Sequence, residues 1–483
     1  MADTFERDRK AIDTMLHPRS IAVLGATARM QYGGRFLKAL LDSKYPGRIY
    51  PVNPKYEELM GVKCYPSVAS LPEVPDLAGV IVPFQEVVPV LEECARKGVP
   101  SAVIITAGFA EREEADRKVA QVQLHELATK TGPRLCGPNC LGLVNVKDTV
   151  WSFSGHYSTL QGIPSGPLAL VAQSGATAFG PLAARAADLG VGLKYIISTG
   201  NEADLEAMDF VRYALDDPEV KAVLTSIEGF KDGAKLRKVA ALALQRGKPI
   251  VILKLGRSEA GSRAARSHTA AMTGSDVVQD AFFKQMGMIR VEDWDELLEV
   301  GSLLAKCPPP ENDGVGVVSH SGGIGGILVD KCGYMGLQVP LPSQKTKEGI
   351  DGILKGFGSA RNPMDVTGYA TSEEFPKILD FMIKDEGFGI IIVGSSGGDS
   401  QAQQIIAAAS STTKPVVMLW TGNLGAEDGL KLLKGSQVPV FYLPDKVVRG
   451  VRKLVDYHRT RRAWLAERQD AKASESVPQA RAA

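Results

Sequence analysis

The stretch Leu168-Ala-Leu-Val-Ala-Gln-Ser-Gly-Ala176 decides how this chain folds. Its first five residues are all apolar, which predicts a strand buried on both faces of a parallel sheet. The small residues from Gln173 onward begin a helix that is expected to run to about Leu189, with Ser174 and Thr177 as candidate caps. Open backbone amides at such a strand-to-helix turn, together with the helix dipole, predict an anion site.

The same pattern returns later in the chain. Val315-Gly-Val-Val-Ser-His-Ser-Gly-Gly323 matches the opening stretch residue for residue in character. Two more pairs follow in the same order: Asn362-Pro-Met-Asp365 matches Asn201-Glu-Ala-Asp204, and Lys414–Gly422 matches Lys248–Gly256. Three landmarks in one order predict an internal duplication.

Apolar strands also alternate with helical segments in the first third of the chain. The strands are expected at residues 20–27, 48–54, 77–83 and 101–108. Ligands of open parallel sheets bind at the carboxyl ends of the strands. Those ends here are Gly25-Ala-Thr27, Asn53-Pro-Lys55, Val82-Pro83 and Thr106-Ala-Gly108.

We therefore predict an α/β protein of three Rossmann- or flavodoxin-like, doubly wound parallel-sheet domains, the last two an internal duplication. The expected domains cover residues 12–146, 147–307 and 312–460. Pro308-Pro-Pro310 marks the boundary between the last two. A basic helix is expected through Arg468, and the Ala-, Ser- and Gln-rich end at 469–483 is expected to be disordered.

The composition excludes several classes of function. The 483 residues are 44% hydrophobic and 23% charged with a net charge of +1, so no general attraction to nucleic acid or to a membrane surface is expected. No apolar run reaches the about 18 residues that span a bilayer, and no signal peptide is evident, which favours a cytoplasmic protein. The six cysteines have no zinc-site spacing, so no metal site is expected.

The first strand invites a dinucleotide interpretation, but the pattern does not fit. No Gly-x-Gly-x-x-Gly follows Gly25, and Asn53 and Lys55 stand where NAD needs an acidic residue. A lysine there suits a phosphorylated ribose or a diphosphate, so NADP or coenzyme A fits better than NAD. A domain that binds no nucleotide remains the alternative.

The loop from Lys254 to Gly274 holds the best candidate for covalent chemistry. It is rich in small residues and contains three arginines and one histidine, His268. A phosphohistidine needs an accessible ring, cations or amides around the phosphoryl oxygens, and a carboxylate that orients the ring. Glu228 ends a neighbouring strand, so it is expected at the same sheet edge as Gln173–Ala176. The alternative is a histidine that only caps or hydrogen-bonds.

The second copy differs where chemistry is expected. His320 lies at a strand end, but the region that corresponds to Glu228 reads Gly-Ser-Ser-Gly-Gly at 394–398. A structural role is therefore expected for His320, and an architectural or partner-binding role for this copy. His125 is expected to be solvated, and His17 has no supporting neighbours in the sequence.

These motifs together resemble the alpha subunit of NDP-forming acyl-CoA synthetases, the superfamily of succinyl-CoA synthetase and ADP-forming acetate–CoA ligase. The resemblance covers about residues 12–457. It rests on Gly25-Ala-Thr27, Val52-Asn-Pro54, Thr106-Ala-Gly-Phe-Ala110, Gly137-Pro-Asn-Cys-Leu-Gly142, Gln173-Ser-Gly175, Gly200-Asn-Glu-Ala-Asp204, Glu228 and Ser267-His-Thr269.

The resemblance implies a role for each matching residue. His268 would accept a phosphoryl group, and Glu228 would steady it. Coenzyme A would be held by Gly25, Ala26, Thr27, Asn53, Lys55, Pro83, Thr106 and Ala107. Phosphate or substrate would be held by Asn139, Gln173, Ser174, Gly175, Ala176 and Asn201.

The implied reaction converts a small carboxylic acid, ATP and coenzyme A into acyl-CoA, ADP and phosphate, through phosphohistidine and acyl phosphate. The chain has no ATP-grasp region, so the resemblance implies a separate ATP-grasp beta subunit that binds ATP or ADP and Mg²⁺, and hence a hetero-oligomer. Ala270 departs from the family pattern, which has glycine there. A non-catalytic CoA-binding or regulatory protein of the same fold, and an NADP-dependent oxidoreductase, remain as alternatives.

Overall fold

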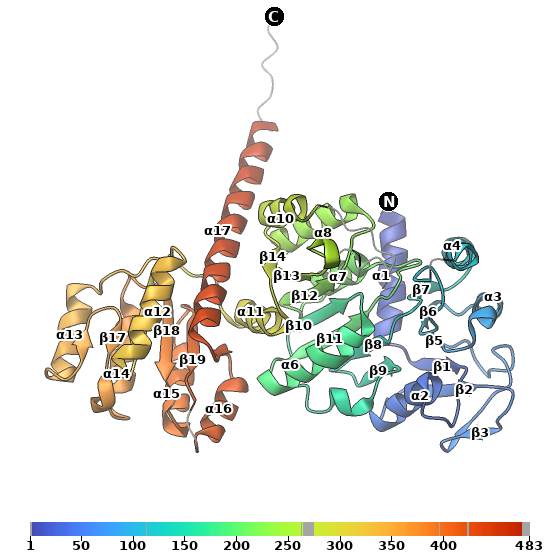
Figure 1. The fold of residues 1–483 in the computed structure, drawn as a ribbon, viewed down its shortest axis with the longest axis horizontal. Coiled ribbons are helices and arrows are strands. Elements are labelled where there is room, and N and C mark those ends of the chain that lie inside the picture. Colours follow the sequence, from blue (N-terminus) through green and yellow to red (C-terminus); the bar gives the residue numbers. More distant parts are fainter. Residues whose placement is uncertain are drawn as a thin grey trace, which may run out of the picture. The chain divides into compact units, whose positions relative to one another are not determined.

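The computed structural model of the protein describes residues 2–112, 114–261, 263, 275–395, 397–422 and 425–475. The chain separates into two compact units, Met1–Leu297 and Leu298–Ala483 (Figure 1). The first unit contains two large, mainly parallel sheets and the second unit contains one, each with helices around it.

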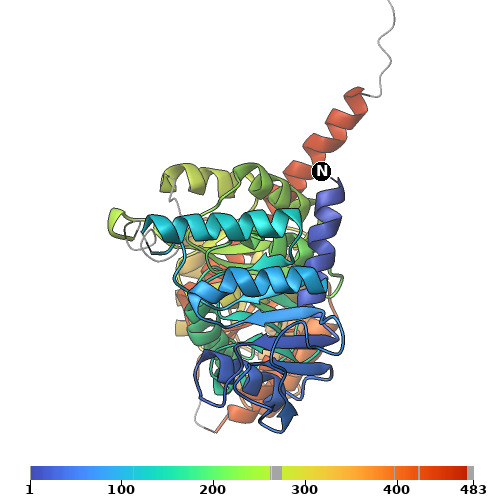
Figure 2. The same ribbon diagram turned by 90° about the vertical axis from the view of Figure 1, so that its right-hand side faces the viewer.

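The first sheet has the strand order β2-β1-β5-β6-β7, with all strands parallel. Its strands are β1 (Ser20–Leu24), β2 (Arg48–Val52), β5 (Leu77–Val80), β6 (Ser101–Ile104) and β7 (Arg134–Cys136). Its helices are α2 (Tyr32–Asp42), α3 (Val87–Lys97) and α4 (Ala115–Lys130), and a small ribbon of β3 (Glu58–Leu59) and β4 (Val62–Lys63) follows β2. Figure 2 shows α3 and α4 side by side. All strands but β2 are buried along their whole length, as predicted from their continuous apolar character.

The helix predicted from Glu111 begins four residues later, at Ala115. The Glu111 carboxylate is the reason, because it folds back and accepts hydrogen bonds from the backbone N–H groups of Gly108 and Phe109. A side chain that satisfies backbone donors in this way favours a turn over a helix.

The second sheet has the order β14-β13-β12-β10-β11-β8-β9. Its strands are β8 (Gly142–Asn145), β9 (Val150–Phe153), β10 (Leu168–Ala172), β11 (Leu193–Ser198), β12 (Ala222–Ile227), β13 (Ile250–Lys254) and β14 (Ile289–Val291). Its helices include α7 (Ala207–Asp216), α8 (Gly233–Arg246) and α10 (Asp276–Gln285), and α11 (Trp294–Lys306) spans the boundary between the two units. The hairpin β8–β9 pairs antiparallel with β11, so β8 belongs to this sheet although it precedes the predicted boundary at 146/147.

The helix after β10 is interrupted rather than continuous. It consists of α5 (Gly175–Thr177), a π-helical segment η3 (Ala178–Leu182) and α6 (Ala183–Leu189). Gly180 has non-helical backbone angles, and Pro181 lies inside the segment. Proline has no N–H to donate to the preceding turn, so the helix widens at this point.

The sheet of the second unit has the order β16-β17-β15-β18-β19-β20. Its strands are β15 (Val315–Ser319), β16 (Ser359–Ala360), β17 (Met364–Asp365), β18 (Ile390–Ser395), β19 (Val416–Trp420) and β20 (Val440–Phe441). Its helices are α12 (Gly322–Tyr334), α13 (Gln344–Leu354), α14 (Phe375–Lys384), α15 (Asp399–Ser410), α16 (Glu427–Lys434) and α17 (Pro444–Glu475). The order β17-β15-β18-β19-β20 repeats the order β11-β10-β12-β13-β14, which confirms the predicted duplication.

Two of the three sequence landmarks of this duplication hold, and one is wrong. The strand at 168–172 and the strand at 315–319 occupy the same place in their sheets, as do β13 and β19. Asn201 follows β11, however, whereas Asn362 precedes β17, the strand that takes the place of β11. The side chain of Asn362 instead accepts a hydrogen bond from Val317 N at 3.0 Å and donates one to Val315 O at 2.8 Å.

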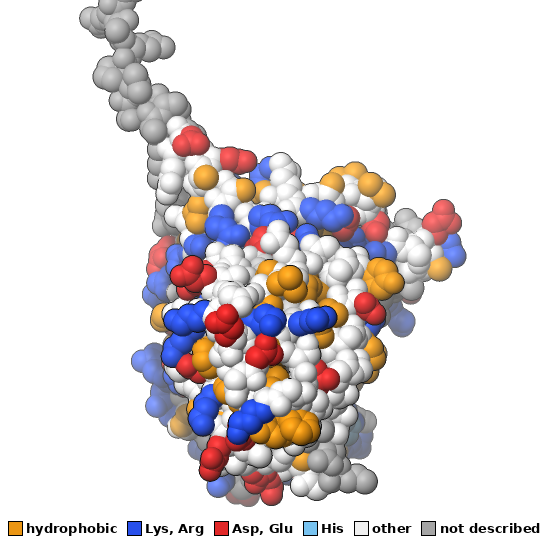
Figure 3. Space-filling view, turned by 90° about the vertical axis from the view of Figure 1, so that its left-hand side faces the viewer, with side chains coloured by type: hydrophobic (Ala, Val, Ile, Leu, Met, Phe, Trp, Pro, Cys, Tyr) orange, Lys and Arg blue, Asp and Glu red, His pale blue; other side chains and the backbone are white. Residues whose placement is uncertain are grey.

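Helix α17 continues to Glu475, beyond the predicted end at Arg468, and residues 476–483 lie outside the described residues. No helix in the described ranges is both long and apolar enough to cross a membrane. Figure 3 views the second unit from the side of α13, where apolar side chains are scattered among charges of both signs.

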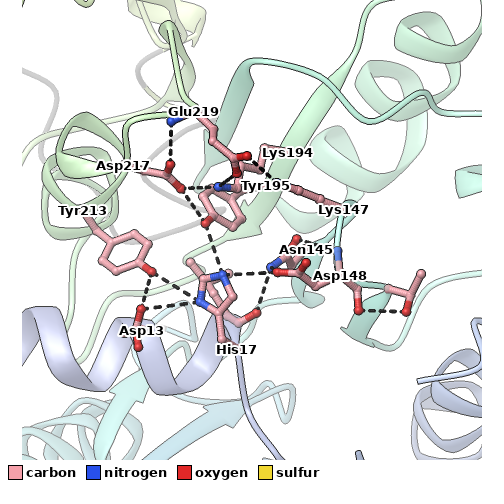
Figure 4. A network of polar contacts seen from close by, with 12 residues as sticks. Asp13, His17, Asn145, Lys147, Asp148, Lys194, Tyr195, Tyr213, Asp217 and Glu219 are labelled. Carbon is pink, nitrogen blue, oxygen red and sulfur yellow. Dashed lines mark hydrogen bonds and ion pairs between the residues drawn. The ribbon is translucent and has the colours of Figure 1, made fainter. Parts of the chain in front are cut away.

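A polar network fastens helix α1 (Ala2–Leu16) to the second sheet (Figure 4). The ring nitrogens of His17 lie 3.5 Å from carboxylate oxygens of Asp13 and Asp148, so the expectation that His17 lacks supporting neighbours is wrong. Tyr195 OH lies 3.4 Å from the same ring and donates to Asp217 at 2.7 Å. Burial and this carboxylate raise the pKa of Tyr195, so its hydroxyl stays a donor.

Candidate functional site

A cavity of about 570 Å³ lies at the carboxyl ends of β1, β5 and β6, where the first sheet meets the turn after β10. Ten of the residues predicted to bind coenzyme A, phosphate or substrate line it. They are Gly25, Thr27, Pro83, Thr106, Ala107, Asn139, Gln173, Ser174, Gly175 and Ala176. Residues to which the sequence analysis assigned no binding role, Gln31, Tyr32, Cys140 and Leu141 among them, complete the lining.

The loop after β1 is shaped by Gly25 and held by Asn53. Gly25 has φ +89°, and a Cβ there would lie 2.2 Å from Ile81 O, so only glycine fits. Asn53 Nδ2 donates to Ala26 O at 2.8 Å, and Asn53 Oδ1 accepts from Lys55 N at 3.0 Å. Asn53 and the buried Ala26 therefore position the loop instead of lining the cavity, and the exposed Lys55 lies outside the lining.

The ends of the two neighbouring strands are tied together beside this loop. Thr106 Oγ1 donates to Val82 O at 2.7 Å, and Asn139 N donates to Thr106 O at 3.1 Å. Asn139 has φ +57°, a conformation that asparagine adopts more readily than most residues. These bonds hold Pro83, Thr106 and Asn139 around one opening.

The helix start at Ser174 forms the wall of the cavity that belongs to the second sheet. Ser174 Oγ accepts hydrogen bonds from Thr177 N at 3.4 Å and Thr177 Oγ1 at 3.1 Å, so the predicted cap is confirmed. The N–H groups of Gly175 and Ala176 are in the first turn, where no intrahelical acceptor exists. They can donate hydrogen bonds to an anion, so this wall can bind an anion without a cationic side chain.

Glu228 follows β12 and is 4% exposed. Its N–H donates to Gln173 Oε1 at 2.7 Å, and the next N–H, of Gly229, donates to the same oxygen at 3.2 Å. Gln173 Nε2 in turn donates to Gly229 O at 2.9 Å. The Gln173 side chain thus holds the turn at Glu228, and the residue also lines the cavity in which it is predicted to bind phosphate or substrate.

Lys254 is a residue of this site to which the sequence analysis gave no role. Its side chain is buried, and Nζ donates to Glu228 O at 2.7 Å and to Leu255 O. Burial lowers the pKa of Lys254 to about 8. The sequence does contain a signal for this residue, because Lys254 is a charged residue that ends an otherwise apolar strand. The equivalent position in the second copy is Trp420.

Asn201 does not face the cavity. It is 2% exposed, and its side-chain amide bonds Glu111 Oε2 at 2.5 Å, Gln121 Oε1 at 3.0 Å and Asn139 Nδ2 at 3.2 Å. Its position joins the first and second sheets, as does the ion pair of Arg134 with Asp204 at 2.9 Å. His125 is exposed, as expected, and one ring nitrogen also bonds Ala203 O at 3.0 Å.

His268 lies outside the described residues, as do the other residues from 264 to 274. The histidine of the second copy, His320, borders a cavity of about 500 Å³, packs on Phe375 with ring centroids 4.8 Å apart, and bonds Gln401 Nε2. Burial lowers the pKa of His320. Within the part of the chain that the structure describes, no group of three or more His, Cys, Asp or Glu residues could hold a metal ion.

Family models match both halves of the first unit. A CoA binding domain matches residues 19–146, and a succinyl-CoA ligase like flavodoxin domain matches residues 165–304. The acetate–CoA ligase [ADP-forming] I subunit alpha of Pyrococcus furiosus is 32% identical over 472 residues, which cover 95% of this chain and 100% of that protein.

Other relatives are longer. The acetate–CoA ligase [ADP-forming] of Methanocaldococcus jannaschii is 37% identical over 360 residues, which are 74% of this chain and 49% of that protein. Among solved structures, the "dinucleotide forming" acetyl-coenzyme A synthetase 1 of Ca. Korarchaeum cryptofilum, in complex with phosphate and ADP, aligns with a TM-score of 0.86 and 28% identity over 94% of this chain and 98% of that chain. The chain therefore belongs to the NDP-forming acyl-CoA synthetase family, with the alpha subunits of ADP-forming acetate–CoA ligases.

Proposed function

We propose that this chain is the alpha component of an ADP-forming acid–CoA ligase, which makes acyl-CoA, ADP and phosphate from a small carboxylic acid, coenzyme A and ATP. The observation that carries the proposal is the shared cavity. It joins the strand ends Gly25–Thr27, Pro83 and Thr106–Ala107 of the CoA binding domain to the helix start at Ser174. A thiol and a phosphoryl group held in one cavity can meet at an acyl carbon.

The proposed sequence of steps uses His268 as the phosphoryl carrier. The ring nitrogen of His268 takes the terminal phosphoryl group of ATP and releases ADP. A carboxylate oxygen of the acid then takes the phosphoryl group from the ring, which forms an acyl phosphate. The sulfur of coenzyme A attacks the acyl carbon, and phosphate leaves. Each displacement is easier than direct condensation of an acid with a thiol.

The residues of this chain assist these steps through orientation and electrostatics. In this proposal the Glu228 carboxylate accepts a hydrogen bond from the second ring N–H of His268, and this bond fixes the tautomer of the ring. The amides of Gly175 and Ala176 bind the phosphate oxygens at the helix start. The strand-end loops of the first sheet bind coenzyme A, with Lys55 at the exposed end for its phosphates.

We assign ATP and Mg²⁺ to a separate ATP-grasp chain, so that the enzyme is a hetero-oligomer. Two features support this assignment: a relative that the match covers over its whole length is an alpha subunit, and the match covers only about half of a longer relative. The acetate in the names of both relatives supports a small acid. The domains at 12–146, 147–307 and 312–460 then serve as CoA-binding, phosphohistidine and third ligase-type domains. Six free, buried cysteines favour the reducing cytoplasm.

The test is phosphoryl labelling of the full chain copurified with its ATP-grasp partner. Incubation with γ-labelled ATP should give acid-labile, base-stable label on this chain, and His268→Asn should abolish it. Addition of acetate and coenzyme A should discharge the label and yield acetyl-CoA. Binding of coenzyme A without any label would instead identify a non-catalytic CoA-binding protein and overturn the proposal.

A further inference from the structure

We propose that Gln173 and Lys254 are positioning residues that clamp the backbone of Glu228 from both sides, and that phosphoryl transfer depends on this clamp. The inference rests on the proposed function, in which Glu228 orients the histidine ring. It adds two residues that affect the reaction only by positioning Glu228.

The clamp follows from the strand order. Strand β12 lies between β13 and β10, and the three strands are in parallel register, with Ile227 opposite Lys254 and Ser226 opposite Ala172. Glu228, which follows β12 directly, therefore emerges between a side chain from each neighbouring strand end. The N–H of Glu228 donates to Gln173 Oε1 at 2.7 Å, and its carbonyl oxygen accepts a hydrogen bond from Lys254 Nζ at 2.7 Å.

Both peptide groups that flank the Glu228 Cα are thus hydrogen-bonded by side chains. Gln173 also bonds the N–H and the carbonyl of Gly229, so the turn cannot rotate without breaking several bonds at once. Because the Glu228 residue itself is buried, a fixed backbone also limits the directions that its carboxylate can take. A carboxylate that orients a catalytic ring needs such support to hold a productive geometry.

A buried lysine such as Lys254 destabilises the folded protein through the desolvation of its charge, which a purely structural role would not require. Its side chain is buried, and in the described ranges Nζ bonds two backbone carbonyls and forms no ion pair. The carboxylates of Asp276 and Glu228 favour the charge of this ammonium, but burial outweighs them and lowers its pKa. An apolar side chain at the same strand end would avoid this desolvation. The buried charge is explained if the grip on the Glu228 carbonyl serves the reaction.

The second copy shows what this sheet edge becomes without the clamp. Trp420 takes the place of Lys254 and is buried, and His320 takes the place of Gln173. His320 bonds Gln401, which lies in the first turn of α15. The clamp and the carboxylate thus occur together in one copy and are both replaced in the other.

The first test measures hydrogen exchange of the amides of Glu228 and Gly229 in the full chain, by mass spectrometry of short peptides. Gln173→Leu and Lys254→Met should each speed this exchange about tenfold or more, since each removes hydrogen bonds from the turn. Lys194→Met is the matched control. Lys194 is a buried lysine of the same sheet, ion-paired with Asp217 at 2.6 Å, and its loss should leave exchange at Glu228 unchanged.

The second test measures turnover of the copurified complex. Lys254→Met should lower kcat about tenfold or more and leave KM for coenzyme A within about twofold, because Lys254 does not line the CoA cavity. Lys254→Arg, which keeps donors at this position, should recover part of kcat. Lys194→Met should keep kcat in protein that remains folded.

The outcomes separate the two proposals. A wild-type complex that takes no phosphoryl label defeats the proposed function, whatever the exchange data show. A labelled wild type with unchanged kcat in folded Lys254→Met defeats the clamp alone. Unchanged exchange at Glu228 and Gly229 in both clamp variants defeats it as well.

Discussion

The second and third sheets share a strand order but differ at their carboxyl edges. In the second sheet, Gln173, Glu228 and Lys254 meet in one hydrogen-bonded group. In the third sheet, the equivalent first and last positions are His320 and Trp420, and the middle one, Ser396, lies outside the described residues.

The scaffold and the chemistry of this fold are therefore separable. The buried strands of the two copies are interchangeable in character, because burial on both faces asks only for apolar side chains. The residues after the strand ends need not be apolar, so a few of them decide whether a sheet edge can bind a ligand or take part in a reaction. Four experiments test this difference between the two sheet edges and the contacts around them.

The largest effect is expected from the carboxylate. Glu228→Gln removes the negative charge but keeps the shape, and it should lower kcat for acyl-CoA formation about 100-fold or more. A change at the same edge of the second copy, His320→Gln, should leave kcat within about threefold. Steady-state kinetics of the copurified complex compares the two. Equal losses would show that both edges take part in the chemistry.

The next effect concerns the buried lysine and pH. The pKa of Lys254 is lowered by burial to about 8 in the folded protein, so the folded state binds fewer protons than the unfolded state between about pH 8 and the ordinary lysine range. Stability therefore rises with pH in this window, and the full cost of burial is present below it. Relative to Lys254→Met, the wild type should gain about 2 to 3 kcal/mol between pH 7 and pH 10.

Urea unfolding of both proteins at several pH values measures this difference. Trp420, at the equivalent position, does not titrate, so Trp420→Met should show no such pH-dependent change relative to the wild type. A constant difference between the wild type and Lys254→Met over the whole range would contradict the lowered pKa.

A smaller effect is expected from the asparagine that joins the two sheets of the first unit. Asn201→Ala removes bonds to Glu111 and Gln121 and leaves them partly unpaired, which should cost about 2 kcal/mol. Urea unfolding gives the loss, and proteolysis should cut near residue 111 faster. Resistance equal to that of the wild type would show that other contacts carry this junction.

The smallest effect is expected from the two serines at the helix starts. Ser174 makes a side-chain cap with Thr177, whereas Ser321, at the start of α12, makes no side-chain cap bond. Ser174→Ala should therefore lower stability by about 1 kcal/mol, and Ser321→Ala by only a few tenths. Thermal unfolding compares them, and a larger loss for Ser321→Ala would reverse the expected order.

Strands and strand ends were predictable from the sequence, because buried parallel strands are continuous apolar runs and their last residues follow directly. That is why Gly25, Thr106 and Ser174, read as strand-end residues, all line the cavity. The direction of a side chain after the strand end was not predictable. Asn201 turns into the junction and Gln173 turns to Glu228, because partners distant in sequence satisfy their buried amides.

The remaining misses have the same physical origin. The match of Asn362 to Asn201 rested on a short stretch of similar sequence, whereas the order of strands in a sheet depends on pairing between distant segments. The sequence predicts Lys254 at the start of a loop, because a lysine rarely ends a buried strand. His268 lies outside the described residues, so its role stays a prediction.

The junction between the first two sheets has a consequence for the kinetics of binding. Asn201 and the ion pair of Arg134 with Asp204 fasten the two walls of the cavity to each other. The site is therefore preorganised, and coenzyme A need not supply binding energy to close two domains around itself. Its association should be a single-step process whose rate rises linearly with concentration, without the plateau that a slow closure would impose.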